Sequence, residues 1–205
     1  MKKIFNSVFL CFLKILFFFL SRRTIKDIQN CLEDNSHVFY FDMGTLLGIV
    51  RDKKLLKNDM DIDVAIIIDD TTRLGDIRRK MRNYGFKLKY SYYGQSIGLL
   101  QDTYYRYGIR VDVSYYRTKN DVNYCYLLYE DNGRYNKLVR LSNTIVKKTK
   151  KVLFNGVMIN IPDDDILYLC ERYGPNWDKP DPGYKYWEGP SAKKIDSVGK
   201  CVVRY

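Results

Sequence analysis

The spacing of apolar positions changes along the chain from a helical period to a strand period. Apolar residues recur every three or four positions over residues 23–35 and 73–84, which predicts two helices, and Gly85 ends the second. A last helix is predicted from Pro162 to Tyr173, because three aspartates occupy its first turn, where the helix dipole favours acids. These helices are spread over the chain and form no repeat.

Strand patterns fill most of the sequence between these helices. The most apolar run, residues 61–68, is continuous enough to be a central strand of a sheet. The tail after Gly174 is rich in proline, glycine and aromatic residues and is predicted to be irregular. This order of elements predicts a mixed α/β domain with flanking helices, not a repeated βαβ unit. Further strands are predicted at residues 37–41, 86–92, 97–101, 105–116, 123–129 and 151–161.

The first twenty residues form a separate apolar segment with cations at both ends. Two lysines precede it, two arginines follow it, and no acid stands before Asp27. Lys14 within it would cost about 2.5–3.5 kcal/mol at the centre of a bilayer. We therefore expect residues 1–22 to form a helix that lies in the membrane interface, followed by a folded domain over residues 23–205. A helix packed on the domain itself and a single span, which needs about 20 apolar residues, are the alternatives.

Composition narrows the class of protein. The 205 residues are 46% hydrophobic and 29% charged, which is typical of a folded globular domain. Five scattered cysteines without a Cys-x-x-Cys pair indicate reduced thiols in a cytoplasmic setting. A single histidine, His37, argues against a zinc site and is interpreted as a strand-edge residue. The net charge of +11 favours anionic partners, which include nucleic acid, phosphorylated small molecules and acidic lipid.

Acids on predicted strands are the most informative chemical feature. Asp61 and Asp63 are two apart, so on a strand their side chains point to one face, and Asp59 raises the local acid density. The carboxylates would repel one another unless a cation lay between them, and such oxygen ligands suit Mg²⁺ or Mn²⁺. Asp112 stands in another apolar strand, and if the two strands are neighbours the site could hold two ions and support in-line displacement at phosphorus. The alternative is that Asp61 and Asp63 are solvent-facing acids on an edge strand.

A glycine–threonine pair shortly before the aspartates adds a possible phosphate site. Gly44 and Thr45 follow a short predicted strand and open a short helix, where backbone N–H groups and the threonine hydroxyl can bind phosphate. Arg51 follows that helix and could clamp a diphosphate through both arms of its guanidinium, with a surface ion pair as the alternative. A Gly-Thr helix start, then Asp-x-Asp on a strand, then a lone strand Asp is the layout of nucleotidyltransferases.

Two motifs in this order resemble the LicD/fukutin-like phosphotransferases. Residues 39–67 contain Gly-Thr-Leu-Leu-Gly-x-x-Arg followed by Asp-x-Asp-Ile-Asp, which is similar to the hallmark of that family. Residues 161–180 contain an acidic helix that ends in Tyr-Gly before a tryptophan and a proline, which is similar to its closing pattern. Met60 stands where family members usually carry a further consecutive acid.

The resemblance implies a nucleotidyltransferase-like fold and a defined reaction. A phosphorylated alcohol, such as phosphocholine or an alditol phosphate, would pass from a CDP-linked donor to a cell-surface glycan or its lipid-linked precursor. Together with the chemistry of the residues themselves, the resemblance assigns catalysis to Asp61, Asp63 and Asp112. The same three residues would bind two Mg²⁺ or Mn²⁺ ions, and Asp112 is the candidate base. Donor binding is assigned to Gly44, Thr45, Arg51, Tyr173 and Trp177, the last two as an aromatic wall; Trp177 is alternatively a packing anchor.

Three classes of function follow from these observations. The first is the transferase just described, acting at the cytoplasmic face of the cell membrane as a peripheral or singly anchored protein. The second is another nucleotidyltransferase, which adds a nucleotide to a protein, a small molecule or RNA. The third is a catalytically silent membrane-bound binding module. The apolar N-terminus and the paired motifs argue against the second class, so no nucleic-acid partner is expected, and three acids in apolar strands argue against the third.

Overall fold

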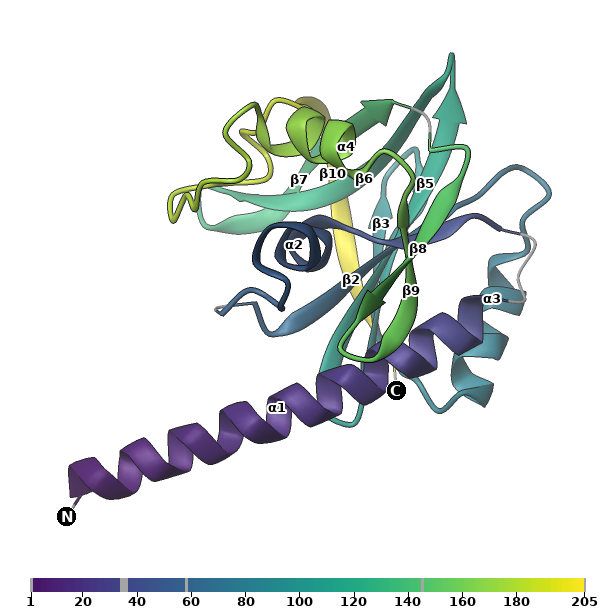
Figure 1. Ribbon diagram of the computed structural model, residues 1–205. Coiled ribbons are helices and arrows are strands. Elements are labelled where there is room, and N and C mark those ends of the chain that lie inside the picture. Colours follow the sequence, from purple (N-terminus) through teal and green to yellow (C-terminus); the bar gives the residue numbers. More distant parts are fainter. Residues whose placement is uncertain (1, 34–36, 58, 145, 205) are drawn as a thin grey trace.

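The computed structural model describes residues 2–33, 37–57, 59–144 and 146–204, and for residues 2–15 it describes the backbone alone. The domain is a mixed α/β structure, as the sequence predicts (Figure 1). The helical elements are α1 (Lys2–Glu33), α2 (Met43–Leu47), the short π-helix η1 (Gly48–Asp52), α3 (Leu74–Asn83) and α4 (Asp165–Tyr173). The strands are β1 (Phe39–Phe41), β2 (Asp61–Ile67), β3 (Lys87–Gly94), β4 (Gly98–Arg106), β5 (Ile109–Lys119), β6 (Val122–Asp131), β7 (Arg134–Thr144), β8 (Thr149–Phe154), β9 (Val157–Pro162) and β10 (Ala192–Val203).

The main sheet has eight strands in the order β1-β2-β5-β4-β3-β10-β7-β6, and β5 also pairs with β6. Strands β2 and β5 are parallel, with Asp63 opposite Asp112, whereas the other described strand pairs are antiparallel. Because β2 lies between β1 and β5, the prediction that residues 61–68 form an internal strand is confirmed. The alternative that Asp61 and Asp63 sit on an edge strand is wrong.

Three strand predictions differ from the structure. The predicted strand over residues 105–116 contains a hairpin turn, in which Tyr107 and Gly108 have φ values of 51° and 81°, as a two-residue type I′ turn requires. Strand β7 was not predicted. The tail is not irregular throughout, because β10 pairs with both β3 and β7. None of its side chains is buried, so its backbone hydrogen bonds to β3 and β7 do more to hold it than the burial of apolar side chains does.

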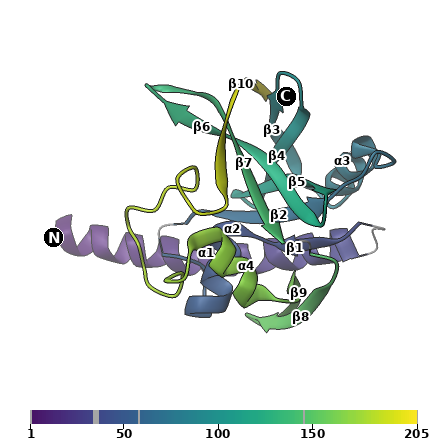
Figure 2. The ribbon, with the colours of Figure 1, turned by 90° about the horizontal axis from the view of Figure 1, so that it is seen from above.

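The N-terminal helix is continuous across the predicted boundary at residue 22. Ile25, Ile28 and Leu32 bury one face of its second half against the domain. Its first half projects away from the sheet in both views (Figures 1 and 2). In the described part of the chain, no helix combines the length and the hydropathy needed to cross a membrane. The side chains of Cys11 and Lys14 lie outside the described residues, and the described cysteines are free thiols.

Strand β10 is packed too closely at Gly199 to accept a larger residue. A Cβ atom added there would lie 2.5 Å from Leu128 Cδ2 and 2.5 Å from the Tyr93 carbonyl oxygen. We therefore expect Gly199→Ala to lower the free energy of unfolding by about 1–3 kcal/mol, measured by urea denaturation. At Gly75, on α3, an added Cβ meets nothing within 4 Å. The control Gly75→Ala should be neutral or stabilising by up to about 1 kcal/mol, and equal stability of the two variants would contradict the close contact.

Candidate active site

Three carboxylates meet at the start of β2. Asp61 and Asp63 lie on the same face of the strand, and Asp59 stands just before it. One oxygen from each of the three lies within 4.8 Å of the others. Met60, which alternates with them, is 65% exposed and stays outside the group. The structure therefore brings together the two predicted ligands and adds Asp59, whose two-residue spacing from Asp61 was visible in the sequence.

The third predicted acid, Asp112, lies beside Asp63 on β5 and is held by two neighbours. Arg110 donates to it through Nη2 to Oδ2 at 2.7 Å and through Nε to Oδ1 at 3.1 Å. Thr103 Oγ1 donates to Asp112 Oδ1 at 2.5 Å. Arg110 Nε also lies 3.9 Å from Asp61 Oδ2. Arg110 was not predicted, although its two-residue spacing from Asp112 places both side chains on one face of β5.

Loss of hydration and like charge both disfavour ionised carboxylates here. Burial, then the carboxylates of Asp61 and Asp112, raise the pKa of Asp63 well above its ordinary value. Burial and the neighbouring Asp61 raise the pKa of Asp59 to about 8. Burial raises the pKa of Asp112 as well, although the Arg110 guanidinium opposes this. The carboxylates thus carry more negative charge than the Arg110 guanidinium balances.

Helix α2 approaches the carboxylates so closely at Gly44 that a side chain there would have to displace Asp59. A Cβ atom there would lie 2.0 Å from Asp59 Oδ2 and 3.7 Å from Asp63 Oδ2. Thr45 is buried, and its Oγ1 accepts the backbone N–H of Asp63 at 2.9 Å. Thr45 thereby ties α2 to β2 and does not line the cavity described below. Met43 has a φ of 46°, which is a strained value for a residue other than glycine.

A buried polar network holds the start of α2 in place. Asp42 caps the helix by accepting the Met43 N–H at 2.7 Å. Its carboxylate also accepts the hydroxyls of Tyr116, at 2.6 Å, and Tyr168, at 2.7 Å. Arg172 Nη2 donates to both hydroxyls, at 2.7 Å and 3.0 Å. The network joins α2 to β5 and α4, which are far apart in the sequence.

The carboxylates line a cavity of about 960 Å³. The predicted residues that line it are Gly44, Arg51, Asp61, Asp63, Asp112, Tyr173 and Trp177. Arg51 faces it while forming a two-pronged ion pair with Asp52, at 2.8 Å and 3.1 Å. Further aromatic residues come from the segment after α4, including Tyr184 and Tyr186. Acidic and aromatic groups therefore share one cavity.

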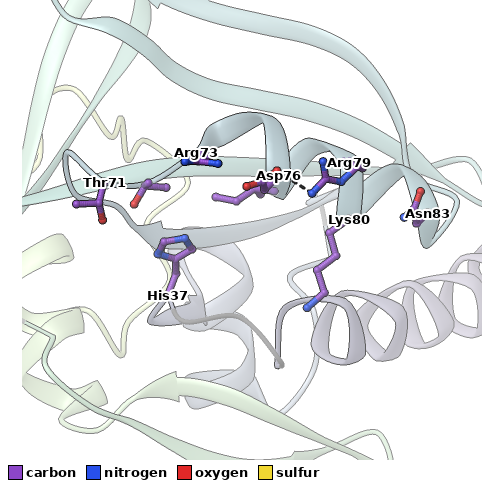
Figure 3. Close-up of a pocket in the computed structure, with 9 residues that line it drawn as sticks. His37, Thr71, Arg73, Asp76, Arg79, Lys80 and Asn83 are labelled. Atoms are coloured by element: carbon purple, nitrogen blue, oxygen red, sulfur yellow. Dashed lines mark ion pairs between the residues drawn. The ribbon is translucent and has the colours of Figure 1, made fainter.

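A second pocket, of about 560 Å³, lies between His37 and α3 (Figure 3). It is lined by Arg73, Arg79 and Lys80, and its one acidic lining residue, Asp76, pairs with Arg79 at 2.8 Å. None of the predicted catalytic or donor-binding residues lines this pocket. The candidate chemistry is confined to the cavity of the aspartates.

The group of Asp59, Asp61 and Asp63 fits a divalent cation. Mg²⁺ and Mn²⁺ favour carboxylate oxygens, and three are within reach of one ion. The raised pKa values of Asp59 and Asp63 mean that a bound cation would relieve repulsion that the protein itself leaves uncompensated. The donor set therefore consists of the oxygen ligands that hard cations such as Mg²⁺ and Mn²⁺ favour.

Comparison with known proteins places the chain in a family. The family described as LicD/FKTN/FKRP, nucleotidyltransferase domain, matches residues 37–164, which is more than half of the chain. The protein therefore belongs to the LicD family, and the resemblance inferred from the two motifs is confirmed. At the level of the family, this membership indicates a transferase of the phosphotransferase type.

Two rickettsial proteins are similar to this chain. An uncharacterised protein of Rickettsia typhi is 26% identical over 156 residues, which cover 76% of this chain and 45% of the relative. An uncharacterised protein of Rickettsia prowazekii is 25% identical over 156 residues, which cover 76% of this chain and 54% of the relative. The chain thus spans about half the length of these curated relatives.

The raised pKa of Asp59 predicts how the stability of the metal-free protein depends on pH. Between the ordinary carboxyl pKa of 3.8 and about 8, the folded state retains a proton that the unfolded state has lost. Stability should therefore fall as pH rises through this range. In Asp59→Asn this contribution is absent, so the free energy of unfolding of the variant, relative to that of the wild type, should increase from pH 5 to pH 8. The measurement is urea denaturation at several pH values in the presence of a chelator. A stability difference that stays constant with pH would contradict the assignment.

Proposed function

We propose that the protein transfers a phosphorylated alcohol from a CDP-linked donor to a glycan or its lipid-linked precursor, assisted by Mg²⁺ or Mn²⁺. The observation that carries the proposal is the convergence of Asp59, Asp61 and Asp63 in a cavity that Gly44 also lines. Membership of the LicD family supports the type of reaction. The CDP-alcohol donor and the glycan acceptor rest on the resemblance of the two sequence motifs.

The cavity supports a nucleotide-linked donor by its size and lining. Its volume of about 960 Å³ lies near the top of the usual range for small-molecule sites, about 300–1,000 Å³. Carboxylates line one part, and Tyr173 and Trp177 line another. Aromatic faces there could stack on the base or contact a choline-like cation. Arg51 could exchange Asp52 for a donor phosphate oxygen.

In the proposed reaction, some of the acidic residues would bind the metal ion and another would transfer a proton. Asp61 and Asp63, with Asp59, would hold the divalent cation, which supplies neutralisation of the donor diphosphate and of the departing oxygen. Asp112, held by Arg110 beside Asp63, would accept the proton of the acceptor hydroxyl. The hydroxyl oxygen would form a bond to the phosphorus nearer the donor alcohol, and CMP would leave with the electrons of the broken P–O bond.

We also propose that the enzyme acts at the cytoplasmic face of the cell membrane, as a peripheral or singly anchored protein. Lysine or arginine occurs six times before Asp27, whereas no acid does. Phe18 and Phe19 of α1 are 48% and 60% exposed. Apolar side chains flanked by cations are typical of helices that bind an anionic membrane surface.

The carboxylates should act as one catalytic unit. Asp61→Asn, Asp63→Asn and Asp112→Asn should each slow Mg²⁺-dependent release of CMP from a panel of CDP-alcohols by about 10²–10³-fold or more, because transition-state stabilisation is lost. Double variants should be little slower than single ones. The metal-free variants should be as stable as the wild type or more so, because repulsion is relieved.

The matched control is Asp76→Asn, which removes an exposed carboxylate on α3 outside the cavity. It should retain wild-type activity. Full activity of the Asp61 or Asp63 variant would refute the site, and loss of activity through unfolding would make these residues structural. Thermal stabilisation by ATP instead of CDP or CTP would favour another nucleotidyltransferase, and no nucleotide response would favour a binding module.

Gly44→Ala should weaken the metal site through Asp59. The added Cβ must displace Asp59 Oδ2, so we expect about tenfold weaker Mg²⁺ binding, measured by the Mg²⁺-dependent shift in melting temperature. The double variant Gly44→Ala/Asp59→Asn should bind Mg²⁺ no more weakly than Asp59→Asn alone. Gly75→Ala serves as the control. If Gly44→Ala binds Mg²⁺ as the wild type does but loses donor affinity, the role of Gly44 is in phosphate binding alone.

A further inference from the structure

The β8–β9 hairpin lies along the second half of α1. At its turn, Arg22 Nε donates to the carbonyl oxygen of Asn155. Further along, the Asn160 N–H donates to Gln29 Oε1 at 2.9 Å, and Gln29 Nε2 donates to Asn160 Oδ1 at 3.2 Å. The hairpin turn therefore sits where the first half of α1 leaves the domain (Figure 1).

One face of the hairpin borders α1. Lys151 and Leu153 share this face on β8, and Met158 and Asn160 share it on β9, with Leu153 opposite Met158. Lys151 and Asn160 both bond to side chains of α1, so Leu153 and Met158 lie on the same side. The opposite face of the hairpin is buried in the core.

Leu153 and Met158 are exposed although they are apolar. Leu153 is 71% exposed and Met158 is 47% exposed. Next along α1, Phe18 and Phe19 are exposed as well. Neighbouring large apolar side chains left in water are typical of an interaction surface.

Among the described residues, the charges near these side chains are mostly positive, although Glu33 of α1 pairs with Lys151 on the same face of the hairpin. Arg22, Arg23 and Lys26 are exposed on α1. Arg22 bonds to the hairpin turn, whereas the Arg23 guanidinium lies over the Tyr107 ring. The nearest acid in the sequence, Asp27, is held by Arg106 at 2.9 Å. Cations beside apolar side chains complement a surface with anionic headgroups over a hydrocarbon layer.

We propose that the tip of the β8–β9 hairpin and the exposed side of α1 form one docking surface for an anionic lipid bilayer. Leu153 and Met158 would enter the interface together with Phe18 and Phe19, and Arg22 would lie at the headgroups between them. This proposal extends the proposed membrane location, because it adds the β8–β9 hairpin to α1 as a second element that contacts the bilayer. The sequence did not connect the hairpin to α1. It does not depend on the proposed reaction.

Two contact points would fix the orientation of the domain, which a single helix would not. The segment after α4, which supplies Trp177 and Tyr184 to the cavity, extends to the left of the domain in both views, as the first half of α1 does, but in Figure 1 it lies above the sheet and α1 lies below it (Figures 1 and 2).

The test compares binding of the full chain to vesicles. Leu153→Glu/Met158→Glu should bind vesicles of phosphatidylcholine and phosphatidylglycerol about tenfold or more weakly than the wild type, measured by co-sedimentation. Ile166→Glu is the control, because Ile166 is 50% exposed and belongs to α4, which lies across the domain from α1 (Figure 1). All three proteins should melt at the same temperature, and binding should fall with added salt and in phosphatidylcholine alone.

A second measurement uses a variant in which the proposed docking surface stays apolar. On binding to vesicles, the tryptophan fluorescence of Leu153→Trp should shift to the blue, and brominated lipids should quench it. The tryptophan fluorescence of Ile166→Trp should show neither change. Equal binding of the glutamate variants with no quenching of Leu153→Trp would overturn the role of the hairpin. Absence of wild-type binding to anionic vesicles would overturn the bilayer as partner and favour a protein. Release of CMP from a soluble donor is measured separately, so failure of the proposed reaction remains distinguishable.

Discussion

The parallel register between β2 and β5 is the constraint on which the site depends. It sets Asp63 opposite Asp112 and Asp61 opposite Arg110, so three acids and one cation share a face of the sheet. Because the surroundings are poorly hydrated, this excess of negative charge raises the pKa of Asp63, and Arg110 compensates only part of it through Asp112. A site built in this way favours cations over neutral or anionic ligands, and a phosphate group could bind beside the carboxylates only together with a cation.

The position of α2 depends on residues far along the chain. Asp42 is buried and ionisable, yet it is stabilised because two tyrosine hydroxyls and a helix N–H point at it. Arg172 donates to the same hydroxyls from α4. The close approach of Gly44 to Asp59 is thus supported by the C-terminal half of the domain. A substitution in α4 that breaks this network would shift α2 relative to the carboxylates.

The segment between α4 and β10 forms one wall of the cavity, and aromatic residues of its second half hold it to the rest of the domain. Tyr184 donates to the carbonyl oxygen of Arg172 at 3.1 Å, and Tyr186 donates to that of Leu128. Trp187 stacks on Tyr129 with ring centroids 5.8 Å apart. Aromatic contacts therefore order a segment that has little regular structure, and they account for part of the high aromatic content of the chain.

The sequence by itself determined the mixed α/β class, the internal strand β2, the helix at Gly44 and the spacing of Asp61 and Asp63, because these follow from local periodicity and composition. It did not predict Asp59 as a member of the carboxylate group or Arg110 as the partner of Asp112, although the two-residue spacings of both were visible in the sequence. That Asp112 lies beside Asp63 depends on the pairing of β2 with β5, which local patterns do not determine. Strand β10 is held mainly by backbone hydrogen bonds to β3 and β7, and because none of its side chains is buried, its apolar residues do not alternate as those of a half-buried strand would. Only the tertiary structure decided that Thr45 faces β2 instead of the cavity, because a hydroxyl bonds to whichever backbone group the fold brings within reach.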